Sequence, residues 1–341
     1  MLSEKLHMNK CFFYLLFFIA LIGSNAAFAQ KPLTTGTIIY QDARLEKLIP
    51  RDSKIEVIGS GFQHIESPVW VRDSSMLLFS DTKAGIIYRW QEGKPLSKFL
   101  EHTGFTGRLP YGEEPGSNGL AIKPNGLLLI CEHGDRRLAS FPLSGKYGMR
   151  TVSDNFQGKR YNSPNDVIVK SDGTIYLTDP PYGLPQKEND PTKEVSVNGV
   201  YRIEANGKSD LMIADLKYPN GLAFSPDEAL LYVSVSDKVH PQILVYPVKK
   251  DGTVGKGKVF FDASALPKQN AEETTDGLKI DKQGNIWASG PGGILIIDKT
   301  GHLMGKISTG EVISNCCWGD DGSMLYITAG AFLYRIKTNV N

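Results

Sequence analysis

Apolar and polar residues follow one another along this chain in short β-rich runs that end at turn signals, with no amphipathic helical stretch between them. The clearest case leads through VIVK into Ser171-Asp172-Gly173 and returns as TIYLTD. An Asp-Gly pair between two such runs is a strong hairpin signal. A third apolar run follows each hairpin: IIYRW, RLASFPL, GVYRIE, QILVYPV, ILIID and FLYRIK. This pattern predicts an all-β repeat protein.

A polar residue stands at the start of each repeat, directly before the first apolar run. These residues are Glu66, Asn118, Asn165, Asn220, Asp276 and Asn315, at successive intervals of 52, 47, 55, 56 and 39 residues. Such spacing is typical of one four-stranded propeller blade per repeat. The chain ends on a third strand, and residues 54–59 form a lone strand that is expected to complete the last blade and close the ring. We therefore predict a six-bladed β-propeller with four antiparallel strands per blade over residues 54–341.

Residues 1–29 have the pattern of a secretion signal, with a basic start, a short apolar core and an A-x-A cleavage site that ends at Ala29. The apolar core is too short for a stable bilayer anchor, although a retained anchor is the alternative interpretation. We expect a periplasmic or secreted protein that has no membrane association after cleavage. Residues 30–53 are expected to form an extended leader ahead of the single propeller domain.

The formal net charge is +1, from 38 basic and 37 acidic residues without long blocks of one sign, so neither nucleic acid nor an anionic membrane is an expected partner. Partners are expected to be small molecules without strong charge, and nothing indicates an oligomeric state. Beyond the signal, Cys131, Cys316 and Cys317 lie in apolar runs and are expected to be buried thiols rather than a disulfide framework.

The innermost strands of a propeller line its central channel, so the six repeat residues are expected to converge at one mouth of that channel. All six carry side-chain oxygens, and Glu66 and Asp276 together supply two negative charges. Oxygen ligands without His or Cys favour a hard cation, and secretion favours calcium. The alternative is that Asn-Gly and Asp-Gly are only turn residues. That alternative explains Glu66 and Asn165 poorly, because no glycine follows either residue.

Several stretches of the chain resemble one known family. They are ESPVW, CEHGDRRL, GKRYNSPNDVIVKSDGTIYLTDPPYGL, YPNGLAFSPDEALLYVS, TTDGLKID and LYITAGAFLYRI. In order and spacing they resemble the senescence-marker-protein/gluconolactonase/luciferin-regenerating-enzyme family, in particular its secreted bacterial sugar-lactonase branch. The resemblance extends from about residue 55 to residue 337.

The resemblance implies a six-bladed propeller that holds one divalent metal ion. Its ligands would be Glu66, Asn165, Asn220 and Asp276, with Ca²⁺ expected and Mg²⁺, Mn²⁺ or Zn²⁺ as alternatives. It further implies that Asp276 donates or accepts the proton when a lactone ring opens. Asn118 and Asn315 are not ligands in that pattern and are expected to bind the substrate or a water molecule.

The second strand of each hairpin returns to the mouth and brings further candidates there. An unshifted imidazole titrates near neutrality, so His133 could move a proton, or it could be a structural histidine beneath the loop. Tyr182 and Arg160 are candidates for binding sugar hydroxyls, although a solvated surface position is the alternative for Arg160. Asp81 and Asp179 also reach this end, and Asp81 is expected to hold a blade turn.

We therefore predict a metal-dependent, gluconolactonase-like hydrolase that opens a sugar lactone by polarisation of the carbonyl and attack by water. No G-x-S-x-G elbow is present, so a covalent acyl-enzyme is not expected. One alternative is a phosphotriesterase-type or other ester hydrolase, and another is a non-catalytic periplasmic propeller that binds a sugar or a protein partner. Loops 104–116 and 182–198 are expected to set specificity.

Overall fold

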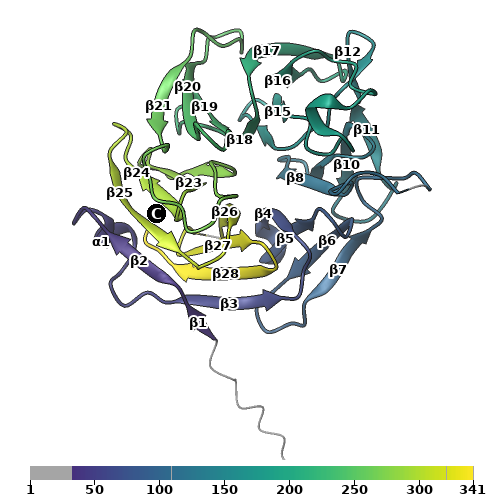
Figure 1. The fold of residues 1–341 in the computed structure, drawn as a ribbon. Coiled ribbons are helices and arrows are strands. Elements are labelled where there is room, and N and C mark those ends of the chain that lie inside the picture. The colour runs from purple at the N-terminus through teal and green to yellow at the C-terminus, as the bar shows by residue number, and fades with distance from the viewer. Residues whose placement is uncertain (1–32, 109, 320, 341) are drawn as a thin grey trace, which may run out of the picture. The chain divides into compact units, whose positions relative to one another are not determined.

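The computed structural model describes residues 33–108, 110–319 and 321–340. The predicted signal sequence, residues 1–29, lies outside the described residues. Six antiparallel sheets stand as blades around a central axis, as Figure 1 shows. The fold is thus the six-bladed β-propeller that the repeat predicts. Within the described ranges, no helix has the length and apolar character needed to cross a membrane.

The first four blades are meanders in which consecutive strands are neighbours. Blade 1 contains β4 (Ile65–Val71), β5 (Met76–Asp81), β6 (Ile86–Trp90) and β7 (Ser97–Glu101), with the 3-10 turn η1 (Arg72–Ser74) after β4. Blade 2 contains β8 (Ser117–Ile122), β9 (Leu127–Glu132), β10 (Arg137–Pro142) and β11 (Arg150–Ser153). Blade 3 contains β14 (Val167–Val169), β15 (Ile175–Asp179), β16 (Asn198–Ile203) and β17 (Ser209–Leu216). Blade 4 contains β18 (Pro219–Phe224), β19 (Leu230–Val235), β20 (Gln242–Pro247) and β21 (Lys258–Asp262).

The last two blades combine C-terminal strands with strands from the N-terminal segment. Blade 5 contains β22 (Leu278–Ile280), β23 (Ile286–Gly290), β24 (Gly293–Ile297), β25 (Leu303–Ser308) and β2 (Thr37–Tyr40). Blade 6 contains β26 (Ile313–Trp318), β27 (Met324–Ala329), β28 (Phe332–Lys337), β3 (Ile55–Ser60) and β1 (Thr34–Thr35). Antiparallel pairing of β3 with β28 confirms the predicted closure of the ring. The segment expected to be an extended leader also contains β1, β2 and the short helix α1 (Leu45–Leu48).

Two small elements lie in the connections on either side of β14 and β15. The hairpin of β12 (Asn155–Phe156) and β13 (Lys159–Arg160) follows blade 2, and the 3-10 turn η2 (Lys187–Asn189) follows β15.

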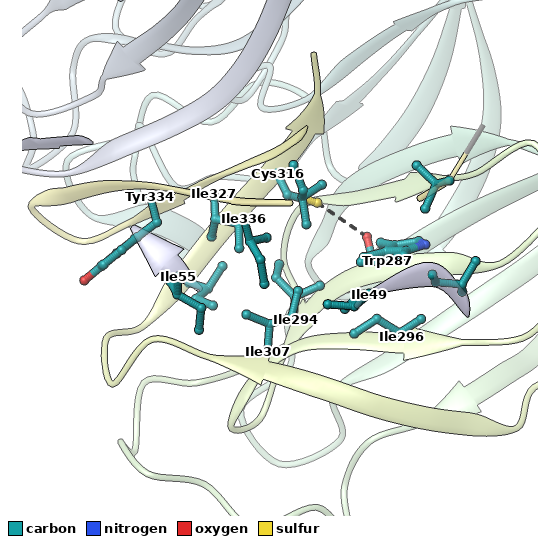
Figure 2. Close-up of a cluster of buried hydrophobic side chains, with 14 of the residues drawn as sticks. Ile49, Ile55, Trp287, Ile294, Ile296, Ile307, Cys316, Ile327, Tyr334 and Ile336 are labelled. Atoms are coloured by element: carbon teal, nitrogen blue, oxygen red, sulfur yellow. Dashed lines mark hydrogen bonds between the residues drawn. The ribbon is translucent and has the colours of Figure 1, made fainter. Parts of the chain in front are cut away.

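Apolar side chains fill the spaces between neighbouring blades. Between blades 5 and 6, Trp287 and Ile294 pack with Ile327 and Ile336, and α1 adds its buried leucines from outside. Figure 2 shows this cluster, in which the Cys316 thiol lies 3.8 Å from the carbonyl oxygen of Trp287. All three described cysteines are buried and free, which confirms their predicted role as small apolar residues.

Candidate functional site

The six repeat residues lie at the inner ends of the blades, where strand pairing is interrupted. In four blades the ladder between the first two strands shifts register beside the repeat residue: between Glu66 and Val69, Ser117 and Leu120, Pro219 and Leu222, and Ile313 and Asn315. Such bulges bend a strand and re-aim its side chains. In blades 3 and 5, β14 and β22 begin two residues after Asn165 and Asp276. The backbone thus frees these side chains from the regular alternation of a strand.

The glycines that follow three repeat residues are required by close contact between blades. A Cβ on Gly119 would lie 2.4 Å from the carbonyl oxygen of Asn165, and one on Gly221 would lie 2.5 Å from that of Asp276. Gly119, Gly221 and Gly277 all lie outside the positive-φ region. The alternative interpretation of these pairs as left-handed turns is therefore contradicted. Gly119 instead donates its N–H to the Asn165 carbonyl oxygen at 2.7 Å, which links blades 2 and 3.

Two carboxyl groups at this mouth are shifted towards their protonated forms. Glu66 is 4% exposed, and burial, followed by the negative charges of Asp276 and Glu114, raises its pKa well above the usual range. Asp276 is half-buried. Removal from water, followed by the charges of Asp166 and Glu114, raises the pKa of Asp276 from 3.8 to about 8. The two carboxyls therefore repel one another as anions, and a cation between them would relieve that repulsion.

The side chains expected to bind metal suit a hard cation in chemical type. Asn165 is 4% exposed and Asn220 is 7% exposed, so both amides are buried, and the Asn220 side chain contacts the Asp276 carboxyl. Over the described ranges, no three or more His, Cys, Asp or Glu side chains form a metal-binding group. Amide oxygens would accordingly have to complete the ligand set, as they do in many calcium sites. The Oε1 atom of Glu66 lies 3.9 Å from the Nε2 atom of His64.

His133 follows β9 and is completely buried. Its Nδ1 lies 3.0 Å from the carbonyl oxygen of Glu114, whereas its Nε2 has no hydrogen-bond partner among the described residues. Burial lowers the pKa of the His133 imidazole, which favours the neutral form. One nitrogen thus has a structural contact beneath the loop, and the other retains its hydrogen-bonding capacity for a ligand or a proton.

Asn118 and Asn315 have different surroundings. The Oδ1 of Asn118 accepts a hydrogen bond from the Ser67 hydroxyl at 3.2 Å, directly beside Glu66. The Oδ1 of Asn315 accepts bonds from the Lys279 ammonium at 3.1 Å and from its neighbouring backbone N–H, that of Cys316, at 2.9 Å. Because the Asn315 oxygen is already used twice, its NH₂ group is what remains for a ligand.

The two other predicted substrate contacts differ in burial. Tyr182 is half-buried and stacks on Tyr218 with ring centroids 6.0 Å apart. Its hydroxyl is buried near Asn220 and Ser236 but forms no hydrogen bond within the described ranges, and burial, with a smaller contribution from the charge of Asp276, raises the pKa of Tyr182. The structure therefore brings Tyr182 to the mouth. Arg160, in contrast, is exposed on β13 and donates from Nη2 to the Asp135 carbonyl oxygen at 3.1 Å, which places it outside the buried group.

Asp81 has the structural role expected of it, because its carboxylate accepts the backbone N–H groups of Gln63 at 2.9 Å and His64 at 3.1 Å. Asp179 likewise accepts the N–H groups of Asn162 and Ser163, each at 2.8 Å.

Two further carboxylates, which the sequence analysis did not single out, act on this mouth. Asp166 is 3% exposed and accepts bonds from the N–H groups of Val167 at 2.8 Å and Leu222 at 3.3 Å. Asp166 directly follows the repeat residue Asn165, and this position in the sequence could have indicated that it lies near the mouth. Glu114 lies in the loop between blades 1 and 2, where no repeat pattern indicates the direction of a side chain.

Comparison with known proteins agrees with this fold. The model of the SMP-30/gluconolactonase/LRE-like region matches residues 65–331. The chain belongs to the SMP-30/gluconolactonase/LRE-like family. Within that family it is 40% identical over 317 residues to a gluconolactonase of Zymomonas mobilis, which covers 89% of this chain and 87% of the relative.

Solved structures show the same architecture. A gluconolactonase from Xanthomonas campestris aligns with a TM-score of 0.78 and 29% identity, over 90% of this chain and 97% of that one. Regucalcin from Agrobacterium tumefaciens, a calcium-binding protein, aligns with a TM-score of 0.64 at 18% identity, over 84% of this chain and 96% of that one. At that identity, the second comparison supports the fold alone.

Proposed function

We propose that this protein is a metal-dependent hydrolase that opens the ring of a sugar lactone of the gluconolactone type. One observation supports the proposal: the carboxyls of Glu66 and Asp276 both have a raised pKa at the blade starts of a propeller, where the amides of Asn165 and Asn220 are also buried. The similarity to gluconolactonases supports the choice of substrate class. The substrate is accordingly expected to be a lactone or a related cyclic sugar derivative.

Glu66, Asn165, Asn220 and Asp276 would hold the metal ion, for which Ca²⁺ is the expected species. A bound divalent cation supplies polarisation of the lactone carbonyl and stabilisation of the negative charge that develops on its oxygen. The donor set of carboxylate and amide oxygens is of the type that calcium prefers.

The chain's own residues would position the substrate and move a proton. Tyr182 and the amides of Asn118 and Asn315 offer hydrogen bonds to ring hydroxyls. Asp276 would carry the proton, with the unpartnered Nε2 of His133 as a second group for the same transfer. In the overall reaction, a water oxygen bonds to the carbonyl carbon and the ring C–O bond breaks. The former ring oxygen takes a proton, and the product is a hydroxy acid.

Replacement of the proposed proton carrier tests this function. The protein is dialysed against chelator, and acid release from gluconolactone is followed as Ca²⁺, Mg²⁺, Mn²⁺ or Zn²⁺ is restored. At saturating metal, Asp276→Asn should lower kcat by roughly 10²- to 10⁴-fold, the usual contribution of a general acid or base. Asp73→Asn, on an exposed turn, is the matched control and should retain full activity.

Unchanged lactone hydrolysis by Asp276→Asn would refute the assigned role. Absence of a metal-dependent rate on every lactone, together with metal-dependent sugar binding, would instead favour a non-catalytic binding propeller. We also propose that residues 1–29 direct export to the periplasm or medium. A mature protein that retains these residues on N-terminal sequencing would contradict that assignment.

A further inference from the structure

The loop of residues 104–116 is tied down over the mouth where it enters blade 2. The N–H of Gly116 donates to the Thr82 carbonyl oxygen of blade 1 at 2.8 Å, and the carbonyl oxygen of Gly116 accepts the His133 N–H at 3.2 Å. One residue earlier, the Pro115 carbonyl oxygen accepts the Gly134 N–H at 3.0 Å. Residues 114–116 are therefore held against the inner ends of two blades rather than projecting into solvent.

The preceding part of the loop meets the second long loop, residues 182–198. A Cβ on Gly112 would lie 3.2 Å from the carbonyl oxygen of Gly183, so the two backbones are close. The exposed carboxylate of Glu113 lies 3.5 Å from the ammonium of Lys187, in η2. The loop that joins blades 1 and 2 thus meets a loop within blade 3, close to His133.

Glu113 and Glu114 are adjacent in sequence but differ in environment. Glu113 is exposed and pairs with Lys187, whereas Glu114 is half-buried, and its carboxylate forms no hydrogen bond or ion pair in the described part of the chain. The oxygens of such a carboxylate remain available as hydrogen-bond acceptors. Such a group is expected to meet its partner when a ligand binds.

The charge of Glu114 acts on groups from three blades. It raises the pKa of Glu66 on blade 1 and of Asp276 beside blade 5, and it also acts on His133 at the end of β9. Since Coulomb interaction weakens with distance, the Glu114 carboxylate lies near all three groups. The Glu114 carbonyl oxygen, at 3.0 Å from His133 Nδ1, fixes the backbone at that place.

Two neutral polar atoms at the same mouth also have no hydrogen-bond partner among the described residues: Nε2 of His133 and the hydroxyl of Tyr182. Buried polar atoms are normally hydrogen-bonded, so these exceptions mark where a polar ligand would be received. A sugar lactone carries several hydroxyl groups, each of which can donate to a carboxylate and also accept from a neighbour.

We infer that Glu114 is a specificity-determining residue whose carboxylate accepts hydrogen bonds from ring hydroxyls of the lactone. This inference rests on the proposed lactonase function and makes the site selective for polyhydroxylated lactones over unsubstituted ones. One hydrogen bond to a charged group increases affinity by about 10- to 100-fold. Without the Glu114 carboxylate, affinity should decrease for lactones that carry the hydroxyls and stay the same for lactones that lack them.

The experiment compares glucono-δ-lactone with δ-valerolactone, which has the same six-membered lactone ring without hydroxyls. For Glu114→Gln at saturating Ca²⁺, kcat/KM on gluconolactone should fall about 10- to 100-fold, mainly through KM, while δ-valerolactone hydrolysis stays the same. Glu113→Gln is the matched control, because it removes the neighbouring charge at the surface, and it should change neither rate. If δ-valerolactone is not hydrolysed, its inhibition constant against gluconolactone serves for the same comparison.

An equal loss on both lactones, or no loss on either, would overturn the inference. A fall in calcium affinity of Glu114→Gln, measured by titration calorimetry without substrate, would also overturn it and assign Glu114 to metal binding. Absence of hydrolysis of any lactone by the unmodified protein refutes the proposed function itself, so the two failures are distinguishable.

Discussion

At the residue scale, the protonation of Asp276 determines how the stability of the protein depends on pH, both without metal and with metal bound. Its pKa lies at about 8 in the folded protein, against an ordinary value of 3.8, so the folded state binds this proton more tightly than the unfolded chain does. The contribution of this group to stability is therefore fully present below about pH 4 and is lost as pH rises towards 8. Burial shifts Glu66 in the same direction.

We predict that calcium stabilises the protein more strongly at pH 8 than at pH 5. At the lower pH the ion must displace a proton from Asp276, whereas at the higher pH the carboxylate is already ionised. Thermal unfolding in chelator and in excess Ca²⁺, measured across this pH range, gives the rise in Tm caused by the metal. Asp276→Asn should make that rise smaller and less dependent on pH, because only Glu66 would then exchange a proton for the metal. A pH-independent rise in the unmodified protein would show that Asp276 does not exchange a proton for the metal.

At the element scale, sequence periodicity predicted the strands well because strand pairing and hairpin turns depend on local pattern. The place of β3 in blade 6 followed from counting strands, and β28 pairs with it as expected. The added strands β1 and β2 were not predicted, because an edge strand depends on a distant partner rather than on its own short sequence. The repeat selected the carboxyls of Glu66 and Asp276, but it contained no information on Glu114, which lies in a loop outside the repeat and contacts His133 through its backbone carbonyl.

The contacts between blades predict the effect of a single methyl group next to the site. A Cβ on Gly221 would lie 2.5 Å from the Asp276 carbonyl oxygen and 2.7 Å from the Gly277 Cα, both backbone atoms that must move. We expect Gly221→Ala to lose about 1–3 kcal/mol in the free energy of unfolding, as overpacked sites do. It should also lower kcat and metal affinity, because Asp276 moves with its backbone.

Urea unfolding, calcium titration and lactone hydrolysis would check these effects. Gly59→Ala on β3 is the control, since its nearest contact is the Phe62 side chain at 3.3 Å rather than the backbone of a repeat residue. It should leave metal affinity unchanged. Normal metal affinity in Gly221→Ala would mean that the Asp276 backbone is not held by this contact.

At the scale of the whole propeller, the N-terminal segment fastens the blades at which the ring closes. In Figure 1 the purple strands β2 and β3 run along the outer side of yellow-green β25 and yellow β28. Between β1 and β2 the chain crosses from blade 6 to blade 5 at Gly36, which has a φ of 74°. A Cβ there would lie 2.3 Å from the Ser308 carbonyl oxygen, so only glycine permits this crossing.

Two truncations should therefore separate the contribution of the added outer strands β1 and β2 from that of β3, which completes blade 6. A chain that begins at residue 41 lacks β1 and β2 but retains β3, so each blade keeps four strands and the ring stays closed. We expect a lower Tm with kcat/KM on gluconolactone unchanged, because the candidate site lies on the innermost strands and not at the outer edge.

A chain that begins at residue 61 also lacks β3, which leaves an unpaired edge on β28 and exposes apolar surface of the last blade. That chain should fail to fold as a soluble monomer, as measured by circular dichroism and gel filtration. Loss of activity in the chain that begins at residue 41, at a temperature well below its Tm, would show instead that the outer strands shape the axial mouth.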